Sequence, residues 1–327
     1  MKIGIAILNW NGLDLLKDNL GKVIRRSDNS NIYIIDNNSS DKSIEYVKDN
    51  FPEVKVISLE KNYGFAEGYN LGLKKINENI VCIMNNDIQV TDNWLDPIRN
   101  LINKNPISII QPTIMDLKNK NYYEYAGAAG GFIDKFGYPY CRGRVFDTLE
   151  KNNGQYQDDK IFWASGACMF IQKKLFYEIG GFDKSFFAHM EEVDLCWRAF
   201  NKGIKCFSST KSIVYHLGAA TIKVNSKKNY FNYRNSLIML TKNLPLGSLL
   251  YVIFIRIILD IISAIYYTIK GRFDLSISVI KAHLDYFRKV KKYLKGRDNN
   301  SKKENYYEIT SVVFKYFVLG KKKFFTL

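Results

Sequence analysis

The first hundred residues alternate short apolar runs with stretches of helical periodicity, and this alternation constrains the fold most strongly. The apolar runs are continuous, rich in Ile and Val, which is typical of parallel strands covered on both faces by helices. Strands are expected at Ile3–Leu8, Ile32–Ile35, Val54–Ser58 and Ile80–Met84, and helices at Leu13–Ile24, Ser43–Asp49 and Ala66–Ile76. The pattern predicts an α/β fold with a mostly parallel central sheet flanked by helices.

The composition changes after residue 112. Residues 113–160 are rich in Gly, Tyr, Asn and Lys, which predicts loops or a hairpin forming a mobile flap rather than a new domain. Further strands are expected at Ala167–Gln172 and Ile213–His216, and further helices at Lys173–Ile179 and Glu191–Lys202. We therefore expect one domain over residues 1–245, with a nucleotide-binding half over about 1–112 and an acceptor or catalytic half over 113–245.

An apolar helix is expected at Leu246–Ile269. It is long enough to cross a bilayer, but Arg256 and Asp260 would each cost about 2.5 to 3.5 kcal/mol at the bilayer centre. On a helix, one stripe would carry Arg256, Asp260, Ser263, Tyr267 and Lys270. This stripe favours a helix lying in the membrane plane or inserted shallowly over one that spans the membrane.

Residues 270–327 are strongly basic. They carry 15 Lys or Arg and 5 Asp or Glu, which contributes +10 (15 − 5) to the chain's net charge of +16. With a basic helix expected near Lys281–Lys295, residues 246–327 are predicted to form an amphipathic extension that associates with an anionic membrane surface. A core helix with a solvated tail is the alternative. Nucleic acid ranks last as a partner, because no nucleic-acid-binding motif accompanies the charge.

The cysteine pattern bears on the compartment. The five cysteines are widely spaced and include no Cys-x-x-Cys pair, which argues against a disulfide framework or a zinc site and favours a reducing cytoplasm. The N-terminal apolar run is too short for a signal peptide. We expect a cytoplasmic protein held peripherally on the inner face of the cell membrane.

Polar residues follow the predicted parallel strands, at the edge where open parallel sheets bind ligands. Those expected to project there are Asn9, Asp36, Asn62 and Asp87. Asp36 and Asn37 follow a buried strand and can accept hydrogen bonds from a base N–H or a ribose hydroxyl; an Asx turn explains them equally well. Gly64 lies where a loop enters a helix, and backbone N–H groups there favour phosphate or ligand hydroxyls. Neither a Walker loop nor a Gly-x-Gly-x-x-Gly fingerprint is present, which disfavours a nucleotide hydrolase and a dehydrogenase.

Asp87 ends an apolar strand together with Asn85 and Asn86. A carboxylate leaving the core needs a partner, and a hydrated metal ion would supply one. His216, one of three histidines, is the candidate nitrogen ligand for the same ion. Carboxylate, imidazole and diphosphate ligands together suit Mn²⁺ at least as well as Mg²⁺. A turn-forming Asp and a structural His are the alternatives.

Three carboxylates, Glu191, Glu192 and Asp194, begin one predicted helix. Asp194 lies four residues before Arg198, so these two are expected to form a structural pair. The helix start favours ionised carboxylates, which a general base must be, and this leaves Glu191 and Glu192 as base candidates. A metal-binding carboxylate beyond a strand's end and a base across a cleft from it together predict metal-assisted sugar transfer.

Several segments, taken in order, resemble the inverting family-2 glycosyltransferases of GT-A fold. They are residues 7–12 (ILNWNG), 35–41 (IDNNSSD), 62–72, 85–87 (NND) and 187–198. Residues 214–221 (VYHLGAAT) and 232–236 (NYRNS) resemble the rhamnosyltransferase-type branch of bacterial surface-polysaccharide synthesis. The resemblance covers about residues 1–245.

This resemblance implies roles for individual residues. The donor-binding set would be Asn9, Asp36, Asn37, Asn62, Gly64, Asn85 and Asn86. Asp87 and His216 would hold Mn²⁺ or Mg²⁺ on the diphosphate, and Glu192 falls where the family places its base, usually an Asp, with Glu191 and Asp194 as alternatives. The implied donor is dTDP-rhamnose or a UDP- or GDP-sugar. The implied acceptor is a polyprenyl-diphosphate-linked saccharide, and a homodimer through the C-terminal helices stays open.

The chain departs from the family pattern in one respect. The metal motif has a single carboxylate, because Asn85 takes the first position of the usual Asp-x-Asp signature. A non-catalytic, membrane-associated sugar-binding protein is therefore one alternative function. A nucleotidyltransferase is another, although residues 9–15 lack the Gly-rich basic triphosphate loop that such an enzyme needs.

Overall fold

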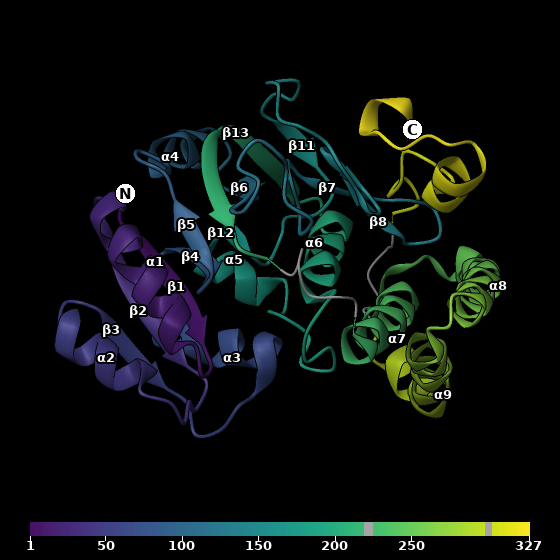
Figure 1. The fold of residues 1–327 in the computed structure, drawn as a ribbon, viewed down its shortest axis with the longest axis horizontal. Coiled ribbons are helices and arrows are strands. Elements are labelled where there is room, and N and C mark those ends of the chain that lie inside the picture. Colours follow the sequence, from purple (N-terminus) through teal and green to yellow (C-terminus); the bar gives the residue numbers. More distant parts are fainter. Residues whose placement is uncertain (219–224, 298–302) are drawn as a thin grey trace.

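The N-terminal part of the computed structural model, which describes residues 1–218, 225–297 and 303–327, is an α/β unit. Its strands are β1 (Ile3–Asn9), β2 (Ser30–Asp36), β3 (Lys55–Ser58) and β4 (Ile80–Asn85), and the helices between them are α1 (Leu13–Arg26), α2 (Ser43–Asn50) and α3 (Gly64–Leu73). β1 pairs in parallel with β2 and β4, and β2 with β3 (Figure 1). The predicted parallel series is confirmed. Its register places Asn9 opposite Asp36 and Leu8 opposite Asn85, so the polar strand ends share one edge.

The second half makes the sheet mixed. It contributes β5 (Ile88–Val90), α4 (Leu95–Lys104), β6 (Ser108–Asp116), β11 (Asp159–Ile161), β12 (Cys168–Gln172), α5 (Lys173–Glu178), α6 (Glu191–Asn201) and β13 (Lys205–His216). The strand order is β11–β13–β6–β12–β4–β1–β2–β3, with β5 paired to β13. β6 and β13 are parallel, whereas β12 is antiparallel to both β4 and β6. β12 begins beside the end of β4, where Cys168 pairs with Met84, so it runs back along β4.

Residues 113–160 do not form the mobile flap that their composition suggested. They include a small antiparallel sheet of β7 (Gly131–Ile133), β8 (Pro139–Cys141), β9 (Arg144–Val145) and β10 (Thr148–Leu149). Phe132, Tyr140 and Val145 of this sheet are buried. The expected hairpin is present, but it is a packed layer because its aromatic side chains have partners.

Those partners come from the C-terminal segment. The predicted basic helix is α9 (Phe273–Lys295), but residues 303–327 do not extend it; they lie against the small sheet instead. The Phe324 ring centroid lies 5.2 Å from that of Phe132, and Val312 N donates to Asp134 Oδ2 at 2.9 Å. Tyr316 OH lies 2.8 Å from Thr148 Oγ1. Phe324 and Tyr316 of this segment therefore pack within the protein, whereas Phe314, Phe317 and Phe325 are exposed.

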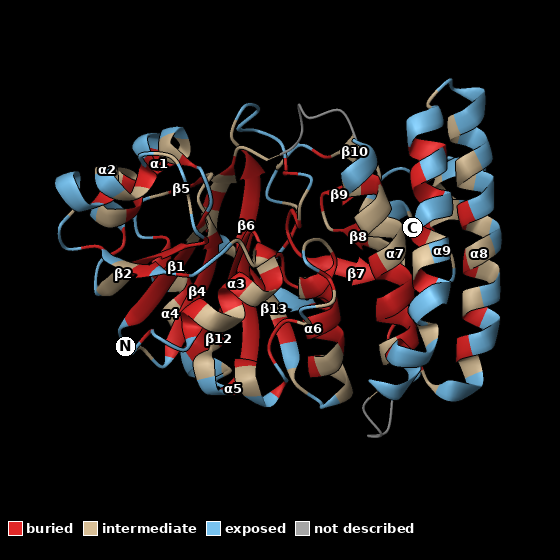
Figure 2. Ribbon diagram, turned by 90° about the horizontal axis from the view of Figure 1, so that it is seen from below, coloured by how far each residue is buried: buried red, intermediate tan, exposed pale blue. Residues whose placement is uncertain are grey.

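Three helices form the other end of the molecule. α7 (Ser226–Asn243) lies between the sheets and the pair formed by α8 (Leu246–Ile269) and α9 (Figure 2). α8 is the single helix in the described residues that is long and apolar enough to cross a membrane, with a mean hydropathy of 2.3.

The charged residues of α8 face the protein. Arg256 Nε lies 2.9 Å from Asp260 Oδ1, and the two residues are 3% and 0% exposed. Asp260 also contacts Tyr138 OH (2.9 Å) and His283 Nε2 of α9 (3.0 Å), and Ser263 bonds to Tyr233 of α7. The predicted polar stripe thus packs inward at Arg256, Asp260 and Ser263, whereas Lys270 at its end is exposed. The outward face exposes large apolar side chains: Leu246, Leu250, Phe254, Ile258, Ile261, Ile262, Ile265 and Ile269.

Candidate active site

Amide side chains form a connected network at the carboxyl ends of the parallel strands. Asn37 Nδ2 donates to Asn62 Oδ1 and to Gly64 O, both at 3.0 Å. Gly64 N donates to Asn62 Oδ1 at 2.9 Å. Asn86 Nδ2 donates to Asn9 Oδ1 at 3.1 Å, and Asn37 N donates to Asn9 O at 2.8 Å. The structure therefore brings together five of the residues predicted to bind the donor.

Asp36 lies at the same edge, as the last residue of β2. It is 6% exposed, and its Oδ1 accepts a hydrogen bond from Ser39 N at 3.1 Å. This is the Asx turn that the sequence allowed. One oxygen of Asp36 thus shapes the loop that follows β2.

Asp87 and His216 meet across the sheet edge. His216 Nε2 lies 3.1 Å from Asp87 Oδ1, and Asn85 Nδ2 lies 3.5 Å from the same nitrogen. On the other side of the ring, Nδ1 lies 3.2 Å from Glu124 Oε2. The side chains of His216 and Glu124 are 7% and 1% exposed. The sequence-based pairing of Asp87 with His216 is therefore a short contact, extended by a buried glutamate that the sequence analysis missed.

The two carboxylates set the charge of this imidazole. Burial lowers the pKa of His216, but contacts with Asp87 and Glu124 outweigh burial and raise it to about 10. Burial raises the pKa of Asp87, yet His216 and the backbone N–H groups of Asp87 and Gly218 hold it below its ordinary value. The two carboxylates thus stabilise a positive charge on the imidazole. A metal cation bound at Nε2 would take the place of the proton there and would be stabilised by the same carboxylates.

These residues fit a divalent cation that is bound partly by the protein and partly by other ligands. Two adjacent ligands of an ion such as Mg²⁺ at ~2.1 Å lie roughly 3 Å apart, close to the Asp87–His216 separation. Glu124 would fix the ring by accepting the Nδ1 proton, which leaves Nε2 as the ligand atom. Among the described residues, no three His, Cys, Asp or Glu side chains converge on one metal position. Diphosphate oxygens and water would complete the ligand set.

Glu191 and Glu192 begin α6, and backbone N–H groups at this helix start bond to both carboxylates. Oε2 of each is buried without a hydrogen-bond partner in the described residues. Burial, reinforced by neighbouring Glu192, raises the pKa of Glu191 well above its ordinary value. Burial also raises the pKa of Glu192, to about 7. Glu192 is therefore expected to ionise near neutral pH.

Glu192 lies beside the strand end that carries the metal candidates. A Cβ atom on Gly166 would be 3.6 Å from Glu192 Cβ and 3.1 Å from the Phe65 ring. The next residue, Ala167, accepts a hydrogen bond from Asn85 N at 3.0 Å through its carbonyl oxygen. The base candidate, the start of α3 and the end of β4 thus meet around Gly166.

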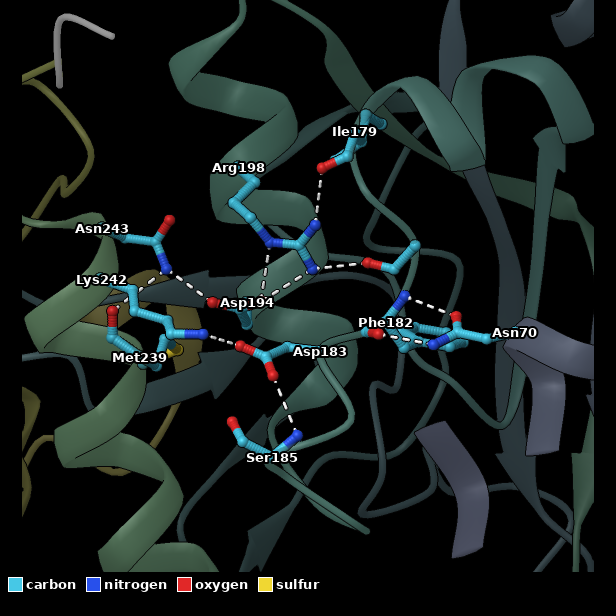
Figure 3. Close-up of polar contacts among 11 residues, drawn as sticks. Asn70, Ile179, Phe182, Asp183, Ser185, Asp194, Arg198, Met239, Lys242 and Asn243 are labelled. Carbon is cyan, nitrogen blue, oxygen red and sulfur yellow. Dashed lines mark hydrogen bonds and ion pairs between the residues drawn. The ribbon is translucent and has the colours of Figure 1, made fainter. Parts of the chain in front are cut away.

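Asp194 differs from these glutamates because both its oxygens are engaged. Oδ2 accepts from Arg198 Nε at 2.8 Å, Oδ1 accepts from Asn243 Nδ2 at 2.7 Å, and the residue is 0% exposed (Figure 3). Arg198 also donates to the carbonyls of Ile179 and Gly181, both at 2.7 Å. The expected structural pair of Asp194 and Arg198 is therefore present. Its geometry argues against Asp194 as the base.

The family follows from comparison with known proteins. Residues 5–180 match the family model described as Glycosyl transferase family 2. The chain belongs to this family. Agl10, a low-salt glycan biosynthesis hexosyltransferase of Haloferax volcanii, is 22% identical over 207 residues, 62% of this chain and 62% of that protein. The match thus spans less than two thirds of that relative.

Two further similarities bear on specificity and fold. An N-acetylglucosaminyl-diphospho-decaprenol L-rhamnosyltransferase of Mycobacterium tuberculosis is 21% identical over 207 residues, 58% of this transferase chain and 67% of that protein. The crystal structure of GalNAc-T7 with UDP, GalNAc and Mn²⁺ superposes with a TM-score of 0.59 at 18% identity, covering 74% of this chain and 48% of that one. The predicted GT-A-like α/β fold is confirmed, with a mixed sheet.

Proposed function

We propose that this family-2 protein is an inverting glycosyltransferase that moves a sugar from a nucleotide-sugar donor to a lipid-linked saccharide. Rhamnose is the sugar that we propose. The observation that carries the proposal is the placement of Glu192. It is partly buried, has one carboxylate oxygen without a partner in the described residues, and packs beside Gly166. The next residue, Ala167, bonds to the end of β4, and Asp87 meets His216 just beyond that strand end. Single displacement requires a proton acceptor for the attacking hydroxyl and a separate site for the leaving diphosphate.

In the proposed mechanism, the ionised Glu192 accepts the proton of the acceptor hydroxyl while that oxygen attacks the anomeric carbon. The attack comes from the face opposite the diphosphate, so the configuration inverts. The amide network around Asn37, with Asp36 and Asn9, orients the nucleoside. Asp87 and His216 would hold the divalent ion, which when bound stabilises negative charge on the leaving diphosphate.

Rhamnose and a polyprenyl-diphosphate acceptor are supported by the named rhamnosyltransferase relative, which the chain resembles at 21% identity. The acceptor proposal also rests on α8. Its outward face is apolar, and the chain that follows it is basic. We propose that this face lies on the cytoplasmic leaflet and brings the cleft to a membrane-held acceptor.

The experiment is transfer to polyprenyl-diphosphate-N-acetylglucosamine with Mn²⁺, using dTDP-rhamnose and a panel of UDP-, GDP- and dTDP-sugars. Nucleoside diphosphate release and sugar incorporation are both measured. We expect one donor to be used and Glu192→Gln to lower kcat by ~100-fold or more, because general bases contribute about that much. Glu45→Gln, at an exposed position of α2, is the matched control.

Three results would contradict the proposal. Full activity of Glu192→Gln would remove Glu192 from the mechanism. Release of pyrophosphate would identify a nucleotidyltransferase. Donor binding without turnover under any condition would identify the non-catalytic sugar-binding alternative.

A further inference from the structure

The segment that leads into α6 follows an unfavourable backbone path. Residues 179–190, here called the base segment, join α5 to Glu191. Three of them are not glycine yet adopt left-handed conformations: Phe187 (φ 63°), His189 (φ 69°) and Met190 (φ 72°). Each such residue costs on the order of 1 kcal/mol or more, so surrounding contacts must hold the path.

Asn235 of α7 supplies the central contact. It is 0% exposed, and its Nδ2 lies within hydrogen-bonding distance of three carbonyl oxygens of the base segment. These are Phe186 O at 3.1 Å, Ala188 O at 2.8 Å and His189 O at 2.7 Å. One side-chain amide therefore gathers the carbonyls that flank Phe187 and lie just before the base candidates.

Arg234 fixes the orientation of that amide. Its Nε and one terminal nitrogen donate to Asn235 Oδ1 at 2.9 and 2.8 Å. The same terminal nitrogen reaches the carbonyls of Ser185 (3.1 Å) and Phe186 (3.2 Å). A guanidinium can only donate, so Asn235 must turn its oxygen toward Arg234 and its NH₂ group toward the base segment.

The base segment in turn touches the donor side. Phe187 O accepts from Phe65 N at 2.9 Å, at the start of α3. A Cβ atom on Gly64 would lie 2.7 Å from the Phe187 ring, so only glycine fits at that position, where φ is also +74°. The backbone path that Asn235 stabilises therefore also contacts the start of α3.

Other residues secure the start of the base segment. Asn70 of α3 exchanges two hydrogen bonds with the backbone of Phe182, Arg198 holds two carbonyls, and Lys242 pairs with Asp183 (Figure 3). These contacts lie several residues before Glu191. The last residues before the base candidates depend on Asn235.

We propose that Asn235, oriented by Arg234, is a positioning residue for the catalytic base. It holds residues 185–190 on the left-handed path that places Glu192 beside Gly166. This inference rests on the proposed function for the role of Glu192. The hold on the backbone itself can be measured without catalysis.

The test is Asn235→Asp, which keeps the shape but removes the NH₂ donors and puts an oxygen against three carbonyls. We expect kcat to fall on the order of 100-fold, because a displacement of about 1 Å costs that much, with a smaller change in the KM for donor. We also expect amide hydrogen exchange in residues 186–192 to rise by ~10-fold or more. Asn232→Asp is the matched control, because it makes the same charge change one turn away and no side-chain hydrogen bond of Asn232 is found in the described residues.

Unchanged hydrogen exchange in a folded Asn235→Asp protein would overturn the positioning role whether or not Glu192 is the base. Faster exchange with unchanged kcat would overturn the link between the path and catalysis. If Asn235→Asp does not fold, Arg234→Gln serves instead, because this variant keeps the side-chain amide of Asn235 but removes the guanidinium that orients it. Exchange in residues 186–192 equal to wild type in that variant would likewise contradict the proposal.

Discussion

Glu191 and Glu192 are neighbours in sequence, yet their surroundings give them different ionisation behaviour. Glu191 is 4% exposed, and burial together with neighbouring Glu192 raises its pKa well above the ordinary value. Glu192 is less deeply buried and has a pKa of about 7. The sequence alone could not separate these two acids, because both fall at the helix start. Burial, which depends on the tertiary fold, separates them.

The pKa of Glu192 predicts a pH dependence. The base must be ionised, so kcat should be low below pH 7 and rise to a plateau above it. Stability should move the other way. The folded protein holds this proton to about pH 7 and the unfolded chain only to about 4.5, so the free energy of unfolding should fall as pH rises between these values. In Glu192→Gln this fall should be smaller. Denaturant titrations at several pH values measure it, and an unchanged slope would contradict the assigned pKa.

Glu124 gives a second prediction for a single residue. If it fixes the His216 ring for metal binding, Glu124→Gln should weaken Mn²⁺ binding by about 10- to 100-fold. Electron paramagnetic resonance of free Mn²⁺ during titration measures this without turnover. Glu150→Gln would be a poor control, because Glu150 bonds to Phe324 N, so the exposed Glu53→Gln is preferred. Equal Mn²⁺ affinity in Glu124→Gln and wild type would show that Glu124 serves only packing.

Among the elements, α8 carries the membrane prediction. Leu250 and Phe254 are 83% and 62% exposed on its outward face. Changing both to Glu should lower binding to phosphatidylcholine–phosphatidylglycerol vesicles by more than about 10-fold, because each side chain contributes roughly 1.5–3 kcal/mol when buried. Cosedimentation measures the binding. Ile107→Glu, equally exposed but on the loop before β6, should bind as wild type does. Retained binding by the double variant, or equal binding of wild type to pure phosphatidylcholine vesicles, would contradict the prediction.

The elements also show where sequence patterns succeed. β1 to β4 were predicted within two residues because continuous apolar strands leave a strong signal. α7 was not predicted, since the side it buries carries Asn229, Asn235, Ser236, Thr241 and Asn243 among its apolar residues. These polar residues interrupt the apolar stripe by which an amphipathic helix is predicted. The direction of β12 could not be predicted either, because the sequence of a strand buried on both faces has the same apolar pattern whether the strand is parallel or antiparallel to its neighbours.

For the molecule as a whole, the sequence predicted the fold class and one edge of the candidate site. It could not predict that Glu124, from a Tyr-rich loop, contacts His216, because that contact depends on the loop folding back onto β6, where Glu124 N donates to Ile114 O at 3.0 Å. The same holds for the C-terminal residues 303–327, whose packing against the small sheet is not indicated by any local sequence pattern. Long-range packing decides both cases.

The placement of α7 bears on the proposed boundary at residue 245. Asn229 of α7 donates to Ser278 Oγ at 2.8 Å, and Thr241 Oγ1 lies 2.6 Å from Tyr286 OH, so both are buried against α9. Asn235, on the same helix, holds the base segment. A protein cut after residue 245 would expose the α9-facing side of the helix that supports its own active site. The extension is therefore not a removable module. Exchanging α8 and α9 between relatives would require exchanging α7 as well, because the position of the base segment depends on how α7 packs against α9.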